Sequence, residues 1–147
     1  MSSTSTFRVL VYNTHLFGRI RPVRLVQSLR ALWPAIPLIT HRERERAALI
    51  ARRVLASDAD VVGLLEVWDR RLLGDLRRRL APAYPHVYDR PHATWRRPFG
   101  CGMAIYSRYP LQAARFVPFR RLVSHDRASN KGVVAARVTL PDGGPLG

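Results

Sequence analysis

An apolar run that ends in a single carboxylate constrains this chain more than any other feature. The run from Val61 to Leu65 contains no polar side chain. Asp58 and Asp60 precede it, and Glu66 follows it. Such a run predicts a strand that is buried on both faces. A carboxylate at the end of a buried strand needs a cation or a hydrogen-bond donor as its partner. Glu66 is therefore predicted either to bind a metal ion or to pair with an arginine, and this stretch alone favours neither.

A helix is predicted on each side of this strand. Thr40 and Glu43 have the spacing of a capping box, which indicates the start of a helix. The apolar face of this helix is predicted to consist of Ala47, Ile50, Ala51, Val54 and Leu55. Asp69 can cap a second helix, stopped by Pro82, that turns four leucines inward: Leu72, Leu73, Leu76 and Leu80.

A first strand is predicted from Phe7 to Asn13, followed by a short segment that contains His15. The order of strand, helix, strand and helix predicts a layered α/β fold, with Asn13 and Glu66 at strand ends on the same edge.

The segment that follows the first strand is predicted to be partly helical, because residues 22–32 have helical spacing. Two prolines interrupt residues 33–39, an apolar loop that either packs on the domain or binds a partner.

Shorter strands are predicted in the second half of the chain, at residues 84–88, 100–111, 113–122 and 132–140. A loop rich in Pro, His, Trp and Arg (89–99) and a polar loop (124–131) separate them. Residues 141–147 read as a turn. A turn needs a following strand, so we expect a domain that the sequence carries only in part.

The net charge of +15 comes from 25 basic residues, of which only Lys131 is a lysine. They are scattered through the chain, so a general preference for arginine explains them as well as a dedicated polyanion site does. Such a charge still attracts nucleic acids and anionic lipid surfaces.

The single cysteine, Cys101, excludes an internal disulfide and a cysteine-built metal cluster. Residues 1–6 are polar, small and expected to be disordered, and the lack of a signal-peptide core predicts a cytoplasmic protein without a transmembrane segment.

Four motifs in succession resemble the endonuclease/exonuclease/phosphatase (DNase I-like) superfamily. They are Tyr-Asn13 in the first strand, Asp60-Val-Val-Gly-Leu-Leu-Glu66-Val, Gly102-Met-Ala-Ile-Tyr-Ser-Arg108-Tyr-Pro-Leu and Asn130-Lys-Gly-Val-Val. The resemblance covers residues 7–140, which are similar to the N-terminal half of such a domain. It implies a layered β-sandwich flanked by helices, with residues 7–147 as a partial domain.

The resemblance also implies a metal-dependent phosphoesterase that acts on a phosphodiester, either a phospholipid or a nucleic acid. The position of Glu66 matches the family's Mg²⁺ ligand, and Asn13 matches the residue that helps hold the metal-bound water or phosphate. Mn²⁺ is the alternative ion, since both prefer oxygen ligands. Within the family, two of the motifs are more similar to the neutral sphingomyelinase branch: Glu66-Val-Trp-Asp and Asn130-Lys-Gly-Val-Val. Leu65 and Trp68 replace the Gln and Lys that are usual in AP endonucleases, which argues against DNA repair.

Three further residues are candidates for contact with the substrate phosphate. His15 follows Asn13 and is interpreted either as such a contact or as a loop histidine without a role. Lys131, the one lysine of the chain, and the preceding Asn130 belong to the last of the four motifs. Chance placement on the surface explains Lys131 nearly as well as a contact with an anionic group.

The family's later motifs, an Asp-x-Asn pair and a C-terminal Asp-His pair, do not occur in this sequence. These groups would activate water and stabilise charge in the transition state. Two function classes therefore stay open. The first is a phosphodiester hydrolase that is inactive or incomplete in these 147 residues. The second is a non-catalytic basic protein that binds anionic partners. An uncovered sheet face is expected to cause self-association.

Overall fold

The computed structural model describes residues 6–16, 42–97, 99–121, 129–140 and 145–146. Several predictions lie outside these residues: the disorder of residues 1–5, the helix at 22–32, the apolar loop at 33–39 and most of the polar loop at 124–131. Thr40 is outside them as well, and so is most of the predicted C-terminal turn.

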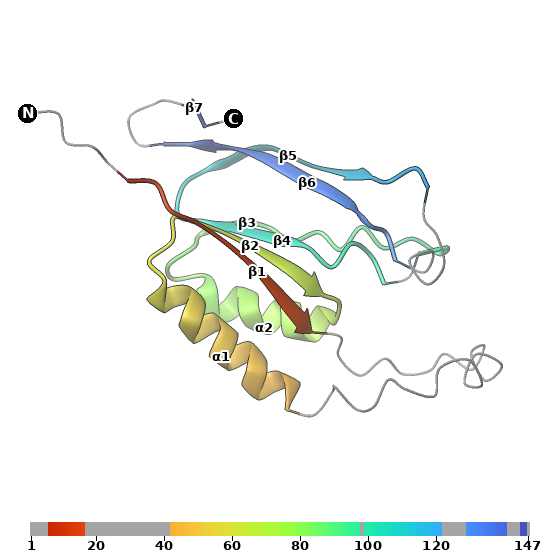
Figure 1. Ribbon diagram of the computed structural model, residues 1–147, viewed down its shortest axis with the longest axis horizontal. Helices are drawn as coiled ribbons and strands as arrows, with labels where there is room; N and C mark the ends of the chain where they lie inside the picture. Colours follow the sequence, from red (N-terminus) through yellow and green to blue (C-terminus); the bar gives the residue numbers. More distant parts are fainter. Residues whose placement is uncertain (1–5, 17–41, 98, 122–128, 141–144, 147) are drawn as a thin grey trace, which may run out of the picture.

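The described part of the chain folds into two sheets and two helices (Figure 1). The first sheet has the order β1-β2-β4-β3, and the second has the order β5-β6-β7. The helices cover one face of the first sheet, and the second sheet lies on its other side. The elements are β1 (Val9–Leu16), α1 (Glu43–Ala56), β2 (Val61–Val67), α2 (Arg70–Leu80), β3 (His86–Tyr88), β4 (Ala104–Ser107), β5 (Leu111–Pro118), β6 (Gly132–Thr139) and β7 (Pro145–Leu146). The predicted α/β class with flanking helices is confirmed.

The main core lies between the helices and the first sheet. Its fully buried members include Val62, Leu64, Leu76, Leu80 and Tyr106. The capping role of Asp69 is confirmed, because its carboxylate accepts hydrogen bonds from the backbone N–H groups of Arg71 (2.7 Å) and Leu72 (3.1 Å). In both helices, the side that packs on the sheet carries the apolar residues that recur with helical spacing.

Helix α1 differs from its prediction at both ends. Arg42, in a left-handed conformation (φ 65°), occupies the N-cap, so Glu43 is the first helical residue and not the third, as the predicted capping box required. The predicted face is buried at four of its five positions, but Leu55 is 42% exposed. Leu55 lies in the last turn beside Val54, which is 2% exposed, so the buried face of the helix is narrower than predicted.

Strand β2 is buried on one face and not on both, which corrects the prediction from its apolar run. Val62 and Leu64 are fully buried against the helices, whereas Val61, Gly63 and Leu65 remain partly exposed. Val11 of the neighbouring β1 lies on this second face, because its Cγ2 is 3.8 Å from the position of a Cβ on Gly63. Val11 is 64% exposed, and Val9, two residues earlier, is 60% exposed. The described residues thus leave apolar sheet surface uncovered, and its self-association stays a prediction.

None of the helices in the described ranges is both long enough and apolar enough to cross a bilayer.

Candidate metal and phosphate site

A β-bulge at the C-terminal end of β1 shapes the candidate site. Strands β1 and β2 are parallel, with Asn13 opposite Leu65 and Leu16 opposite Val67. Two residues of β1, Thr14 and His15, therefore lie opposite the single residue Glu66 of β2. Both His15 (φ 52°) and Glu66 (φ 58°) adopt the left-handed conformation, which is uncommon for residues other than glycine.

This bulge corrects two details of the sequence interpretation. Strand β1 continues through Leu16, so Asn13 is not its last residue, and His15 is a strand residue and not a loop residue. The Thr14 hydroxyl, with the residue 1% exposed, donates a hydrogen bond to the carbonyl of Leu65 (2.9 Å). This bond holds the two strands together at the bulge, where the regular ladder is interrupted.

The bulge brings three predicted site residues together. His15 Nδ1 lies 2.6 Å from Glu66 Oε2, and Asn13 Oδ1 accepts a hydrogen bond from the backbone N–H of His15 (3.2 Å). The side chains of His15 and Glu66 are 51% and 32% exposed. Asn13, His15 and Glu66 thus form an open polar cluster at the C-terminal edge of two parallel strands, which is where α/β folds place their ligands.

Arg46 of α1 is a contributor that the sequence interpretation missed. Its guanidinium donates hydrogen bonds to the backbone carbonyls of Thr14 (Nη2, 3.0 Å) and His15 (Nη1, 3.5 Å). The available signal was its place directly before Ala47, on the flank of the apolar face of the helix. That signal could show that Arg46 borders the sheet, but not which backbone groups it reaches.

The predicted contact residue Asn130 is 7% exposed and bonded to the 91–100 loop. Its Nδ2 donates to the carbonyl of His92 (2.8 Å), its Oδ1 accepts from Arg97 Nη1 (2.7 Å), and its backbone N–H donates to Gly100 (2.6 Å). These hydrogen bonds anchor the loop and do not join Asn130 to the Asn13–His15–Glu66 cluster. The Lys131 carbonyl accepts a bond from the N–H of Phe119 (2.9 Å). Phosphate contacts by Asn130 and Lys131 stay predictions.

His92 shows how this loop packs on the second sheet. Its ring stacks on Phe116 with centroids 4.5 Å apart, and its Nε2 lies 2.7 Å from the Tyr88 hydroxyl. Burial lowers the pKa of His92, and the nearby positive charge of Arg90 acts in the same direction. The contacts of its ring and of its carbonyl give His92 a structural role beside Asn130.

The donor set of the cluster fits a magnesium ion that is only partly enclosed by protein. Mg²⁺ is commonly held by one or two carboxylates, with water and substrate phosphate completing its shell. Glu66 offers one carboxylate and Asn13 one amide oxygen at the same edge. Nowhere in the described ranges do three or more His, Cys, Asp or Glu side chains gather closely enough to hold a metal. The cluster therefore suits a hard ion with several open positions better than a closed structural site.

A known protein family accounts for most of this chain. The model of the Endonuclease/Exonuclease/phosphatase family matches residues 12–144. This chain belongs to that family. The resemblance inferred from the four motifs is confirmed, and the family's members include phosphoesterases. None of the curated proteins matches the sequence.

Solved structures show the same fold. Sphingomyelinase C from Streptomyces griseocarneus superposes with a TM-score of 0.74 at 22% identity, over 97% of this chain and 47% of that chain. SmcL superposes at 0.67 with 25% identity, over 95% and 45%. A beta toxin mutant from Staphylococcus aureus with bound magnesium ions gives 0.67 at 20% identity, over 97% and 47%. The chain therefore spans about half the length of these structures.

Proposed function

We propose that this chain forms the metal-binding part of a divalent-metal-dependent phosphodiester hydrolase. The observation that carries the proposal is the contact between the Glu66 carboxylate and His15 at the β1 bulge, next to Asn13, whose amide oxygen accepts the His15 backbone N–H. Glu66 would hold Mg²⁺ or Mn²⁺, and the Asn13 amide would contribute an oxygen ligand or orient a bound phosphate. Sphingomyelinase C, one of the similar structures, supports a phospholipid head group as the substrate, and nucleic acid is the alternative.

Each residue of the cluster would have a different chemical role. When bound, the ion would polarise a phosphoryl oxygen. Neutral His15 with its proton on Nδ1 can donate to Glu66 Oε2, which orients the carboxylate and leaves Nε2 as an acceptor. The His15 side chain is 51% exposed and so lies on the open side of the cluster.

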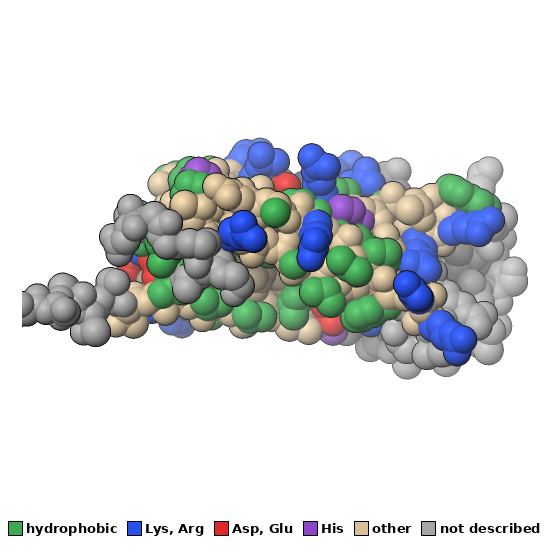
Figure 2. All heavy atoms as spheres, turned by 90° about the horizontal axis from the view of Figure 1, so that it is seen from above, with side chains coloured by type: hydrophobic (Ala, Val, Ile, Leu, Met, Phe, Trp, Pro, Cys, Tyr) green, Lys and Arg blue, Asp and Glu red, His purple; other side chains and the backbone are tan. Residues whose placement is uncertain are grey.

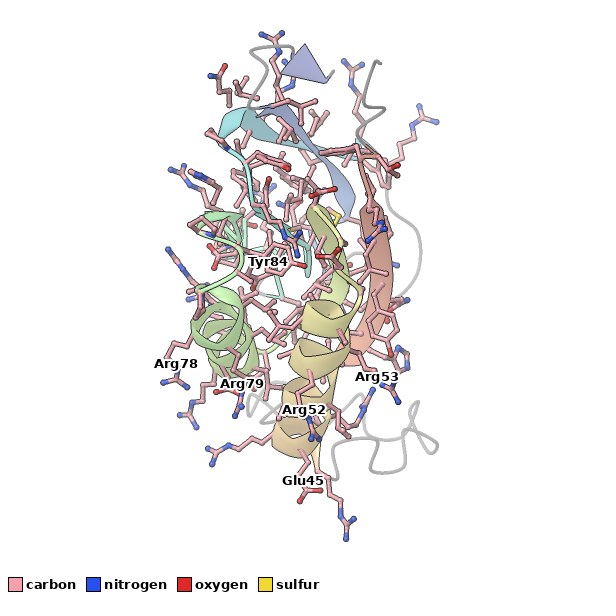
Figure 3. All side chains as sticks on the ribbon, turned by 90° about the vertical axis from the view of Figure 1, so that its left-hand side faces the viewer. Glu45, Arg52, Arg53, Arg78, Arg79 and Tyr84 are labelled. Carbon is pink, nitrogen blue, oxygen red and sulfur yellow. The ribbon has the colours of Figure 1, made fainter. Side chains whose placement is uncertain are left out.

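General binding of polyanions is the second candidate function, and the charge distribution favours it. Arg52, Arg78 and Arg79 project outward from the two helices (Figure 3). On the face seen in Figure 2, Lys and Arg side chains are scattered among apolar ones and do not form one patch. A diffuse field of this kind binds DNA or anionic lipid without selectivity, and the binding weakens steeply as salt increases.

Metal binding tests the proposal most directly. We expect Mn²⁺ to bind wild-type protein, as measured by titration calorimetry and by paramagnetic broadening of the His15 signals, and binding to weaken at least about tenfold in Glu66→Gln. Glu45→Gln is the matched control, because the Glu45 side chain is 69% exposed on α1. Equal affinity in wild type and Glu66→Gln contradicts the assignment.

Turnover gives a second readout. We expect residues 1–147 alone to hydrolyse neither sphingomyelin, bis-p-nitrophenyl phosphate nor plasmid DNA above a Mg²⁺ control without protein, because the sequence supplies no Asp-x-Asn or C-terminal Asp-His pair. Robust turnover that disappears in Glu66→Ala would show that other residues of this chain complete the site. Salt-sensitive DNA binding without any metal binding would favour the second candidate function.

A further inference from the structure

We propose that Arg46 is the positioning residue of this site, and that its guanidinium holds the β1 bulge in the shape that sets His15 against Glu66. The hydrogen bonds of Arg46 go to backbone oxygens. Its effect on metal binding rests on the proposed function. Its effect on the bulge does not, and can be measured separately.

The two hydrogen bonds of Arg46 reach consecutive carbonyls on the bulged strand. Nη2 lies 3.0 Å from the Thr14 oxygen, and Nη1 lies 3.5 Å from the His15 oxygen. A bulge interrupts the strand ladder, so its carbonyls need partners from outside the sheet. A planar guanidinium presents two donors in a fixed fork and can bond both oxygens at once, whereas a lysine ammonium is a single point charge.

Helix α1 presents Arg46 to the bulge from a fixed position. The first turn of α1 lies below the C-terminal end of β1 in Figure 1. The Arg46 N–H donates to the carbonyl of Arg42 (2.9 Å), and the next residue, Ala47, is fully buried. The helix backbone therefore cannot shift without disturbing the core, and the arginine side chain transmits that rigidity to the strand.

The backbone of the cluster explains why such a clamp is needed. His15 (φ 52°) and Glu66 (φ 58°) face each other in conformations that L-residues adopt at a cost. Conformations of this kind persist where the surroundings hold them. The Thr14–Leu65 hydrogen bond holds the bulge from within the sheet, and Arg46 holds it from the helix layer. Without Arg46, the bulge is expected to relax and the His15–Glu66 contact to loosen.

Backbone amide exchange by NMR tests the proposal independently of metal and of activity. The informative amide is that of Trp68, which donates to Leu16 directly after the bulge (2.8 Å). The internal reference is the amide of Asp60, which donates to Arg8 at the other end of the same strand pair (2.8 Å). In Arg46→Met we expect exchange at Trp68 to accelerate about tenfold while exchange at Asp60 is unchanged.

Two further variants complete the experiment. Arg46→Lys should give an intermediate rate at Trp68, because an ammonium can replace one of the two contacts. Arg52→Met removes the same charge from an exposed position of α1 and should behave as wild type. Mn²⁺ affinity should weaken severalfold in Arg46→Met, recover partly in Arg46→Lys and stay unchanged in Arg52→Met.

Three results would overturn the proposal. The first is unchanged exchange at Trp68 in Arg46→Met. The second is equal acceleration at Trp68 and Asp60, which would show a general role in stability. The third is Mn²⁺ binding that Arg46→Met leaves at wild-type strength. If the wild type binds no Mn²⁺, the proposed function fails, and the comparison of Trp68 with Asp60 still decides whether Arg46 holds the bulge.

Discussion

The two ends of the β1–β2 strand pair hold acidic residues that have different kinds of partner. At the N-terminal end, Asp58 and Asp60 meet Arg8 and Arg108, whereas at the C-terminal end Glu66 meets His15. Asp58 (φ 52°) and Glu66 (φ 58°) even share the left-handed backbone conformation. The difference therefore lies in the partners of the two carboxylates and not in the local backbone.

The N-terminal end is an anchor that joins three strands. Asp60 Oδ2 accepts from the backbone N–H of Arg8 (2.8 Å), and its Oδ1 lies 3.4 Å from the Tyr109 hydroxyl. Asp58 bonds Arg108 Nη2 (2.6 Å) and Arg8 Nη1 (2.8 Å). The hydrogen bond and charge of Arg108, followed by those of Arg8, hold the pKa of Asp58 below its ordinary value.

The comparison shows that a carboxylate can either form a structural ion pair or remain available for metal binding, depending on its partners. Arginine stays charged at any physiological pH, so the anchor is neutralised within the protein. Two guanidinium groups bond Asp58, whereas a single imidazole nitrogen meets Glu66, which leaves that carboxylate able to attract a cation. Substitutions at the anchor should therefore change stability, and those at the site should change metal binding.

The largest stability effect is expected at Asp60. Asp60→Ala removes the acceptor of the Arg8 N–H from a residue that is 8% exposed. We expect it to lower the free energy of unfolding by about 1–3 kcal/mol, measured by urea denaturation. The Mn²⁺ affinity of the folded protein should stay at its wild-type value. A loss of Mn²⁺ affinity without a loss of stability would break the division between anchor and site.

A smaller effect of opposite sign is expected at Glu66. Glu66→Gly removes the steric cost of φ 58°, and the gain in stability should be at most about 1 kcal/mol, reduced by the flexibility of glycine and by the loss of the single His15 contact. The matched variant is Asp58→Gly, which relieves a similar φ but also removes both arginine contacts. Thermal unfolding should place Glu66→Gly above Asp58→Gly, and the reverse order would contradict the comparison.

The smallest effect is the pH dependence of the anchor. Because the pKa of Asp58 is lowered in the folded protein, its contribution to stability is fully present above the ordinary value of 3.8 and is lost as pH falls below it. Wild type should therefore be more stable than Asp58→Asn at neutral pH, and the gap between their urea midpoints should close below pH 3.8. A gap that widens with acid would contradict the assigned direction.

Local sequence patterns were sufficient to predict the framework of this domain. Helical spacing predicted the buried positions Ala47, Ile50 and Val54, and a single side chain, Asp69, predicted the start of α2. Strand order alone placed Asn13 and Glu66 on one edge, because parallel strands end together. These inferences succeeded because period, capping and strand direction are properties of short segments.

The tertiary structure alone decided how the site is assembled. The contact between His15 and Glu66 joins residues 51 positions apart, and the bond from Arg46 to Thr14 joins residues 32 apart. Both depend on one extra residue in β1 and on the packing of α1 beneath it, and neither leaves a periodic signal in the sequence. The choice of partner for each carboxylate, arginine for Asp58 and histidine for Glu66, follows from which side chains the two ends of the sheet bring within hydrogen-bonding distance.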